Sequence, residues 1–264
     1  MTKPAIVIIQ ARSSSSRLPN KVLKPLAGRP MIWHIVQRAR ACENVGHVVV
    51  ATSVDPSDDA LAKFCAETKI ECYRGSLSNV LSRYLGVLEH FDYPYFVRIT
   101  GDCPLIHPPF IDRQIQALIT HDADLVRCDA PSTLLEGQST CSTRSLRRIA
   151  QASDHPDDQE HVGARFYAEH PEAFRTVGLQ LPPHLKDNRW RLTVDEAKDY
   201  QIMATLYEAL YRGQAIPLED VVDYLERHPE VAAINQYVEH SAINQELATL
   251  RSTKLPRVVS TLVW

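Results

Sequence analysis

The sequence predicts an α/β fold, with a mostly parallel, Rossmann-like nucleotide-binding sheet flanked by helices and a smaller antiparallel excursion. Short apolar runs rich in β-branched residues alternate with segments of helical period, which is typical of βα units. The alternation is lost between about residues 130 and 190, where we expect the excursion. The 264 residues are 44% hydrophobic and 23% charged, enough for a large core. We expect residues 1–240 to form one domain.

The expected elements follow one another with short connections. The first strand is the apolar run at 5–9, and a charged loop separates it from a helix at 31–42. The next elements are a strand at 47–52, a helix at 58–68, a strand at 71–73, a helix at 79–91, a strand at 95–99, a helix at 108–120 and a strand at 124–128. The excursion is predicted to contain a turn near Glu136-Gly137, a helix at 158–169 and a strand at 174–181. The regular pattern returns with a strand at 192–195, a helix whose apolar stripe includes 203–210, and a helix at 218–227.

Composition and charge exclude several classes of protein. The formal net charge is −3, so no whole-surface field attracts nucleic acid. The apolar run at 5–9 is too short for a signal peptide or a membrane span, so we expect a cytoplasmic protein with no membrane partner. The six cysteines lack both zinc-site spacing and disulfide-scaffold density. We expect reduced thiols, with Cys42 and Cys65 filling the core.

Residues 241–264 are expected to form a C-terminal tail. The tail has a weak helical pattern after His240 and ends on the apolar stretch from Val258 to Trp264. Such an apolar end is expected to dock on the domain or on a second subunit.

The loop from Gln10 to Lys21 contains three cations and four serines. It follows a buried strand, and open α/β sheets bind ligands at the carboxyl ends of their strands. Serines let backbone N–H groups approach a polyphosphate, while arginine and lysine bind its oxygens. Composition alone leaves a solvated basic loop equally open. Neither the Walker pattern nor Gly-x-Gly-x-x-Gly occurs, which disfavours a P-loop kinase and a dinucleotide-binding dehydrogenase.

Two aspartates follow predicted strands that are far apart in the chain. Asp102 comes after the strand at 95–99, where Gly101 permits a tight turn, and Asp195 follows Val194. Two carboxylates at one sheet edge could share Mg²⁺, which takes one or two carboxylates plus phosphate oxygens and water. From the residues alone, a helix N-cap explains Asp195 better. Both explanations stay open at this point.

Several motifs together resemble a known family. The loop reads Ala-Arg-x-x-Ser-x-Arg-Leu-Pro-x-Lys, which is similar to the opening of the CMP-sugar synthetases, the acylneuraminate and 3-deoxy-manno-octulosonate cytidylyltransferases. The spore-coat polysaccharide (SpsF-like) branch is most similar. The resemblance continues through Val49–Ser53, Arg74–Ser76, Arg98–Ile106, Glu160–Val162 and Arg191–Asp195.

The resemblance implies Mg²⁺-dependent transfer of CMP from CTP to a small acidic or phosphorylated acceptor, with release of pyrophosphate. Arg12, Lys21 and Asp102 would be the catalytic residues, and Asp102 and Asp195 would bind the metal. The residues implied for nucleotide binding are Gln10, Ala11, Arg12, Ser15, Arg17, Lys21, Arg74 and Asp102. For Arg74, a surface cation before a turn is the alternative. The family also implies a homodimer.

The sequence departs from the SpsF-like pattern in the acceptor region. Those relatives read Asp-Gly-Leu-Asp-Val-Glu-Val, whereas this chain has Ser139 and Cys141 in place of the two inner acids. Fewer acids favour a more anionic acceptor, because like charges repel when partly desolvated. The residues expected to bind the acceptor are Arg98, Ser139, Cys141, Glu160 and His161. For Glu160, a partner of the helix dipole is the alternative.

Three other functions compete with this interpretation. The phosphate loop does not read the base, so UTP or dTTP could be the donor. A glycosyltransferase would need an Asp-x-Asp motif, and the candidate Asp122-Ala123-Asp124 starts a strand, at the wrong end for a site. A catalytically silent nucleotide-sugar-binding protein is the third.

Overall fold

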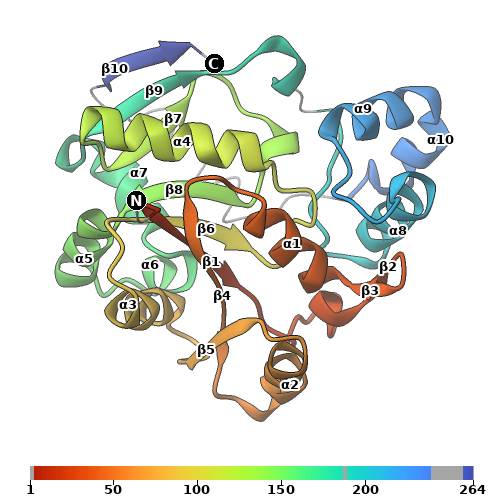
Figure 1. Ribbon diagram of the computed structural model, residues 1–264, viewed down its shortest axis with the longest axis horizontal. Coiled ribbons are helices and arrows are strands. Elements are labelled where there is room, and N and C mark those ends of the chain that lie inside the picture. Colours follow the sequence, from red (N-terminus) through yellow and green to blue (C-terminus); the bar gives the residue numbers. More distant parts are fainter. Residues whose placement is uncertain (1–2, 187–188, 239–257, 264) are drawn as a thin grey trace.

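The computed structural model describes residues 3–186, 189–238 and 258–263, and its centre is a twisted sheet. Within these residues the sheet has eight strands in the order β10-β9-β7-β8-β6-β1-β4-β5 (Figure 1). The strands are β1 (Ala5–Gln10), β4 (Val45–Ser53), β5 (Glu71–Gly75), β6 (Tyr95–Thr100), β7 (Leu125–Cys128), β8 (Gln138–Ser142), β9 (Thr176–Gln180) and β10 (Val258–Val263). A separate hairpin joins β2 (Pro25–Leu26) and β3 (Arg29–Pro30).

Helices cover both faces of the sheet. They are α1 (Met31–Arg40), α2 (Asp59–Glu67), α3 (Val80–His90), α4 (Pro108–His121), α5 (Thr143–Ala152), α6 (Pro156–His161), α7 (Ala164–Glu169), α8 (Ala197–Leu210), α9 (Leu218–Arg227) and α10 (Pro229–Ala232). One hydrophobic cluster joins α1, α2, α4, α8 and α9 to the face with Val7 and Ile9. A second joins α3 and α5 to the face with Ile6 and Ile8.

Strand β1 lies between β4 and β6 and is parallel to both. Its residues from Ala5 to Ile9 are fully buried, which explains why the run is apolar without alternation. Gln10 is level with Ala51, two residues before the end of β4, and with Thr100 at the end of β6. The loops that follow these strands therefore leave the same edge of the sheet.

The structure confirms the α/β fold with a mostly parallel sheet. The antiparallel part between residues 130 and 190 is the single strand β8, which lies between β6 and β7. Gly137 precedes β8 with a φ of 70°, and a Cβ there would approach the Cys103 sulfur to 2.2 Å. The strand expected at 174–181 is present as β9, and it pairs parallel with β7.

Two expected elements are wrong. The helix predicted at 158–169 is two helices, α6 and α7, because Val162 and Gly163 adopt left-handed backbone angles between them. The strand predicted at 192–195 is an extended segment outside any strand. Its alternating Leu192 and Val194 are buried, and Val194 N donates to Asp102 O at 2.8 Å. Burial and one backbone bond, rather than a ladder, explain its apolar pattern.

The apolar end of the chain contributes a strand to this chain's own sheet. β10 pairs parallel with β9, and Arg113 of α4 donates to the carbonyl of Val263 at 2.5 Å. The helical pattern after His240 lies outside the described residues. The six cysteines are free thiols, and Cys42 and Cys65 are buried as expected. No described helix combines the length and apolar character needed to cross a membrane.

Candidate active site

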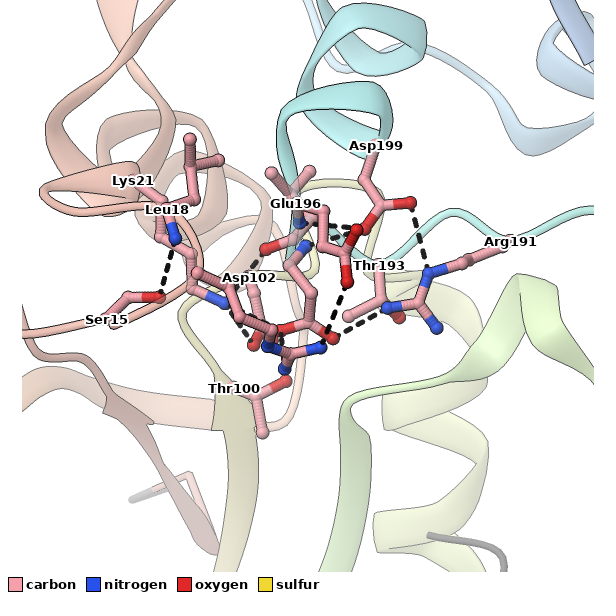
Figure 2. Close-up of polar contacts among 12 residues, drawn as sticks. Ser15, Leu18, Lys21, Thr100, Asp102, Arg191, Thr193, Glu196 and Asp199 are labelled. Atoms are coloured by element: carbon pink, nitrogen blue, oxygen red, sulfur yellow. Dashed lines mark hydrogen bonds and ion pairs between the residues drawn. The ribbon is translucent and has the colours of Figure 1, made fainter. Parts of the chain in front are cut away.

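Lys21 joins the two aspartates that are 93 residues apart in the sequence. Its Nζ donates to Asp102 Oδ2 at 2.9 Å, to Asp195 Oδ1 at 3.0 Å and to Val194 O at 2.9 Å (Figure 2). Burial lowers the pKa of Lys21, but the two carboxylates raise it further, so the net pKa lies above the ordinary value. Burial raises the pKa of Asp102, but the Lys21 ammonium and the hydrogen bonds to the carboxylate lower it by more, so the net pKa lies below the ordinary value. Both groups are therefore charged at neutral pH.

Local backbone geometry brings Lys21 and Asp102 together. Asn20 takes a left-handed conformation (φ 56°), which asparagine tolerates, and starts the short 3₁₀ turn that contains Lys21. On the other side, Gly101 N donates to Gln10 O at 2.8 Å, and a Cβ on Gly101 would lie 2.9 Å from that of Ala11. The turn expected after this strand is present, since Cys103 N donates to Thr100 O at 3.3 Å, and glycine also permits the close approach of β6 to the loop.

A buried ion-pair network holds Asp195. Arg191 Nη2 donates to Asp195 Oδ2 at 2.7 Å, while Arg191 Nε donates to Asp199 Oδ1 at 3.1 Å. The Asp199 side chain is 1% exposed and also accepts from Asn235 Nδ2 at 2.8 Å. Burial lowers the pKa of Arg191, but the two aspartates more than offset it, so the net pKa is raised. Arg191 and Asp199 thus hold the Asp195 carboxylate in place, a role that the sequence did not indicate for either residue.

The N-cap explanation for Asp195 is wrong, because Glu196 is the N-cap residue of α8. The backbone N–H groups of Asp195 and Glu196 both donate to Asp199 Oδ2, at 3.0 and 2.9 Å. Both carboxylate oxygens of Asp195 instead contact cations. Oδ1 lies 3.0 Å from Arg17 Nη2 as well as from Lys21 Nζ, and Oδ2 accepts from Arg191. Capping does not account for this carboxylate.

Asp58 anchors the first half of the cation-rich loop. It is fully buried and accepts from Ser13 N at 2.6 Å, from Ser53 N at 3.1 Å and from the Ser53 hydroxyl. Burial would raise the pKa of Asp58, but these hydrogen bonds lower it below 3.8. At its other end the loop closes on itself, since Asn20 N donates to Ser13 O at 2.9 Å.

Replacing Asp58 by alanine is expected to lower the free energy of unfolding by about 1–3 kcal/mol, because buried donors lose their acceptor. A lowered folded pKa means that the carboxylate stabilises the protein above pH 3.8 and that this contribution is lost as the pH falls through the folded pKa. Urea unfolding between pH 3 and 7 measures both effects. Asp59→Ala is the control, because Asp59 is exposed and makes a surface ion pair. Equal losses in the two variants would contradict the anchoring role.

A second group of polar residues lies at the carboxyl end of the sheet face that α3 and α5 cover. Arg98 Nε and the Tyr84 hydroxyl both donate to Gln10 Oε1, at 3.1 and 3.2 Å. Burial lowers the pKa of His161, and the nearby Arg98 lowers it further. Arg12 Nη2 lies 3.4 Å from Glu160 Oε1, so the loop after β1 contacts α6. Arg98 makes no ion pair with any carboxylate in the described part of the chain.

The remaining predicted site residues have other surroundings. Arg74 donates to Ser53 O at 2.8 Å and to Asp59 Oδ1 at 2.7 Å, so it braces the turn after β4. Ser15 Oγ accepts from Leu18 N within the loop. Ser139 is level with Arg98 in the sheet, whereas Cys141 is two residues further from the carboxyl edge and 7% exposed in the core. The structure does not bring Cys141 to the carboxylates.

The Asp122-Ala123-Asp124 motif is bound by arginines. Arg144 donates to Asp122 Oδ1 and to Asp124 Oδ1, each at 2.7 Å, and Arg175 N donates to Asp124 Oδ2 at 3.0 Å. These residues precede β7 and lie away from the carboxyl edge of the sheet. The motif is a structural ion-pair cluster, and it gives no support to a glycosyltransferase.

Comparison with known proteins agrees with this geometry. A family model described as cytidylyltransferase matches residues 6–216. The chain belongs to the cytidylyltransferase family. It is 30% identical to the spore coat polysaccharide biosynthesis protein SpsF of Bacillus subtilis, over 86% of this chain and 96% of SpsF.

Solved structures share the fold of this cytidylyltransferase. A cytidylyltransferase from Leptospira borgpetersenii superposes with a TM-score of 0.80 at 23% identity, covering 91% of this chain and all of that one. A CMP-2-keto-3-deoxy-manno-octonic acid synthetase in complex with CTP has a TM-score of 0.55 at 18% identity, covering 78% and 99%.

Sequence reasoning missed the supports of the cytidylyltransferase site. The sequence predicted only that a helix begins at Asp58 and that Arg191 belongs to a family motif. Asp199 and Asn235 received no role. The one local signal was the acidic pair Glu196 and Asp199 at a helix start, which fits a capping box. Their contacts to Asp195 come from tertiary structure.

Proposed function

We propose that this cytidylyltransferase transfers CMP from CTP to a small anionic acceptor, releases pyrophosphate and uses Mg²⁺. The observation that supports this most directly is the meeting of Asp102, Asp195 and the loop cation Lys21 at one edge of the sheet. A triphosphate needs cations and an activating metal needs oxygen ligands, and this edge supplies both.

The oxygen donors at this edge suit a hard cation. Asp102 and Asp195 provide carboxylates, and Val194 provides a carbonyl. This composition fits Mg²⁺, which usually keeps water and substrate phosphate among its ligands. Bound there, Mg²⁺ would supply positive charge beside the α-phosphate and the attacking oxygen.

The chain's own residues have separate tasks in this proposal. Arg12, Arg17 and Lys21 bind the triphosphate and stabilise charge on the pyrophosphate as it leaves. The backbone at Gln10 and Ala11 lines the nucleotide side. An acceptor oxygen then attacks the α-phosphorus in line, and orientation supplies much of the acceleration.

The acceptor side is proposed to bind an anion. Arg98 lies beside His161 and has an amide, Gln10, as its hydrogen-bond partner instead of a carboxylate. Ser139, level with Arg98, adds no negative charge. A phosphate, phosphonate or carboxylate on the acceptor would balance the positive charge of Arg98.

The test is a pyrophosphate-release assay in which purified protein, Mg²⁺ and each nucleoside triphosphate are combined with a panel of acceptors. The panel contains 2-keto sugar acids, sugar phosphates, phosphonates and acyl phosphates, with neutral sugars as the matched control. We expect turnover with CTP and an anionic acceptor, and none after addition of EDTA. Preference for UTP or dTTP would reassign the donor. Nucleotide binding without turnover on any acceptor would support the silent binding protein instead.

A further inference from the structure

The Lys21 ammonium occupies the position between the two carboxylates that the proposed function assigns to the metal. We propose that Lys21 is a built-in substitute cation: it neutralises Asp102 and Asp195 in the unliganded protein and must leave them when the divalent ion binds. The inference rests on the proposed function, because it takes those carboxylates as the metal ligands.

The contacts of Lys21 use every hydrogen-bond donor of the ammonium. Three N–H bonds meet three oxygens, those of Asp102, Asp195 and Val194, at 2.9–3.0 Å. Figure 2 shows the Lys21 amine directed toward Asp102. The whole residue is only 9% exposed, so water competes weakly for the ammonium. The position is filled by a well-matched monovalent cation.

A divalent ion held between the two carboxylates would compete with the ammonium for these oxygens. Mg²⁺ requires oxygen at about 2.0–2.1 Å in octahedral geometry, which would draw Asp102 Oδ2 and Asp195 Oδ1 onto the ion. Those are the two carboxylate oxygens that bind Lys21. Two cations with a combined charge of three would then lie within a few ångströms of each other. Entry of the metal therefore displaces the amine.

The nucleotide offers the displaced amine a new partner. All three cations of the loop are paired with acids from other parts of the chain: Arg12 with Glu160, Arg17 with Asp195 and Lys21 with both aspartates. A triphosphate provides anionic oxygens for the same cations, while the metal takes the aspartates. Each ligand thus removes an obstacle to the other, and their binding is positively coupled.

Arg17 provides a matched control for charge alone. Arg17 Nη2 lies 3.0 Å from the same Asp195 Oδ1, and its side chain is 43% exposed. It makes no contact with Asp102 among the described residues, so it does not bridge the two carboxylates. Removing Arg17 deletes one positive charge beside the site without vacating the bridging position.

The first experiment measures Mn²⁺ binding without nucleotide, from the electron paramagnetic resonance signal of free Mn²⁺. Lys21→Met is expected to bind Mn²⁺ on the order of tenfold more tightly than the wild type, because the carboxylates lose their competing cation. Arg17→Met is expected to gain less than Lys21→Met. Equal or weaker binding by Lys21→Met, or the same gain in both variants, would overturn the proposal.

The second experiment uses the wild-type protein, so it does not depend on folding of a variant. Brief acetylation followed by mass spectrometry gives the reactivity of Lys21 relative to the exposed Lys63. We expect this ratio to rise several-fold when Mn²⁺ alone is added. An unchanged ratio at saturating Mn²⁺ would refute displacement. Failure of pyrophosphate release with the ratio still rising would reject the proposed function and leave the displacement of Lys21 standing.

Discussion

Asp102→Asn is expected to reduce CMP transfer by about 10³-fold or more, while the protein stays folded. The substitution keeps the size of the side chain and removes the charge that it would offer to the metal. Lys21 keeps its contacts to Asp195 and to Val194 O, so the loop retains its anchor. Pyrophosphate release at saturating CTP and acceptor measures the loss in kcat.

The control for this loss is Asp129→Asn. Asp129 also follows a strand of the same sheet, but it binds Lys186 Nζ at 2.6 Å and Leu181 N at 2.9 Å, apart from the proposed site. Its variant is expected to keep kcat within about threefold of the wild type, since surface substitutions are usually mild. Undiminished turnover in Asp102→Asn would defeat the metal assignment.

Asp199→Ala is expected to lower the free energy of unfolding by about 3–5 kcal/mol, the usual effect of removing one partner of a buried ion pair. Arg191 would remain buried without its ion pair to Asp199, while keeping its pair with Asp195, and two backbone N–H groups would lose their acceptor. Because these contacts also fix Asp195, turnover by the folded fraction should fall as well. Urea unfolding and steady-state kinetics measure the two effects.

Asp220→Ala separates this buried pair from ordinary helix-start electrostatics. Asp220 lies in the first turn of α9, as Asp199 does in α8, but it is exposed. Its variant is expected to lose less than about 1 kcal/mol, the size of a surface helix-dipole interaction. Similar losses for the two aspartates would contradict the network's role.

Much of the fold was predictable because the parallel core has a simple pattern. The run from Ala5 to Ile9 is apolar at every position, as a strand covered on both faces must be. Helix α5 was missed because only Leu146 and Ile149 are large apolar residues on its buried side. Small side chains fill the rest: Thr143 and Ser145 are buried, and Ser142 Oγ caps the helix by accepting from Ser145 N. Pattern reasoning gives such a polar helix little weight.

The site was predictable only where a motif names the residue. The sequence placed Asp102 and Asp195 after predicted strands, the resemblance assigned roles to them and to Lys21, and the structure brings both carboxylates within hydrogen-bond distance of Lys21 Nζ. The roles of Arg191 and Asp199 could not be read from the chain, because the 192–195 segment has the alternation of a strand yet makes no ladder. Its conformation is set by burial and by side chains from distant elements.

The most direct test of the account is anomalous diffraction from crystals grown with Mn²⁺ and CTP, since manganese gives its own signal. We predict one strong peak in coordination contact with carboxylate oxygens of both Asp102 and Asp195, with the Lys21 amine moved onto the triphosphate. A peak held by the phosphates alone, with Lys21 still bridging the two aspartates, would contradict it.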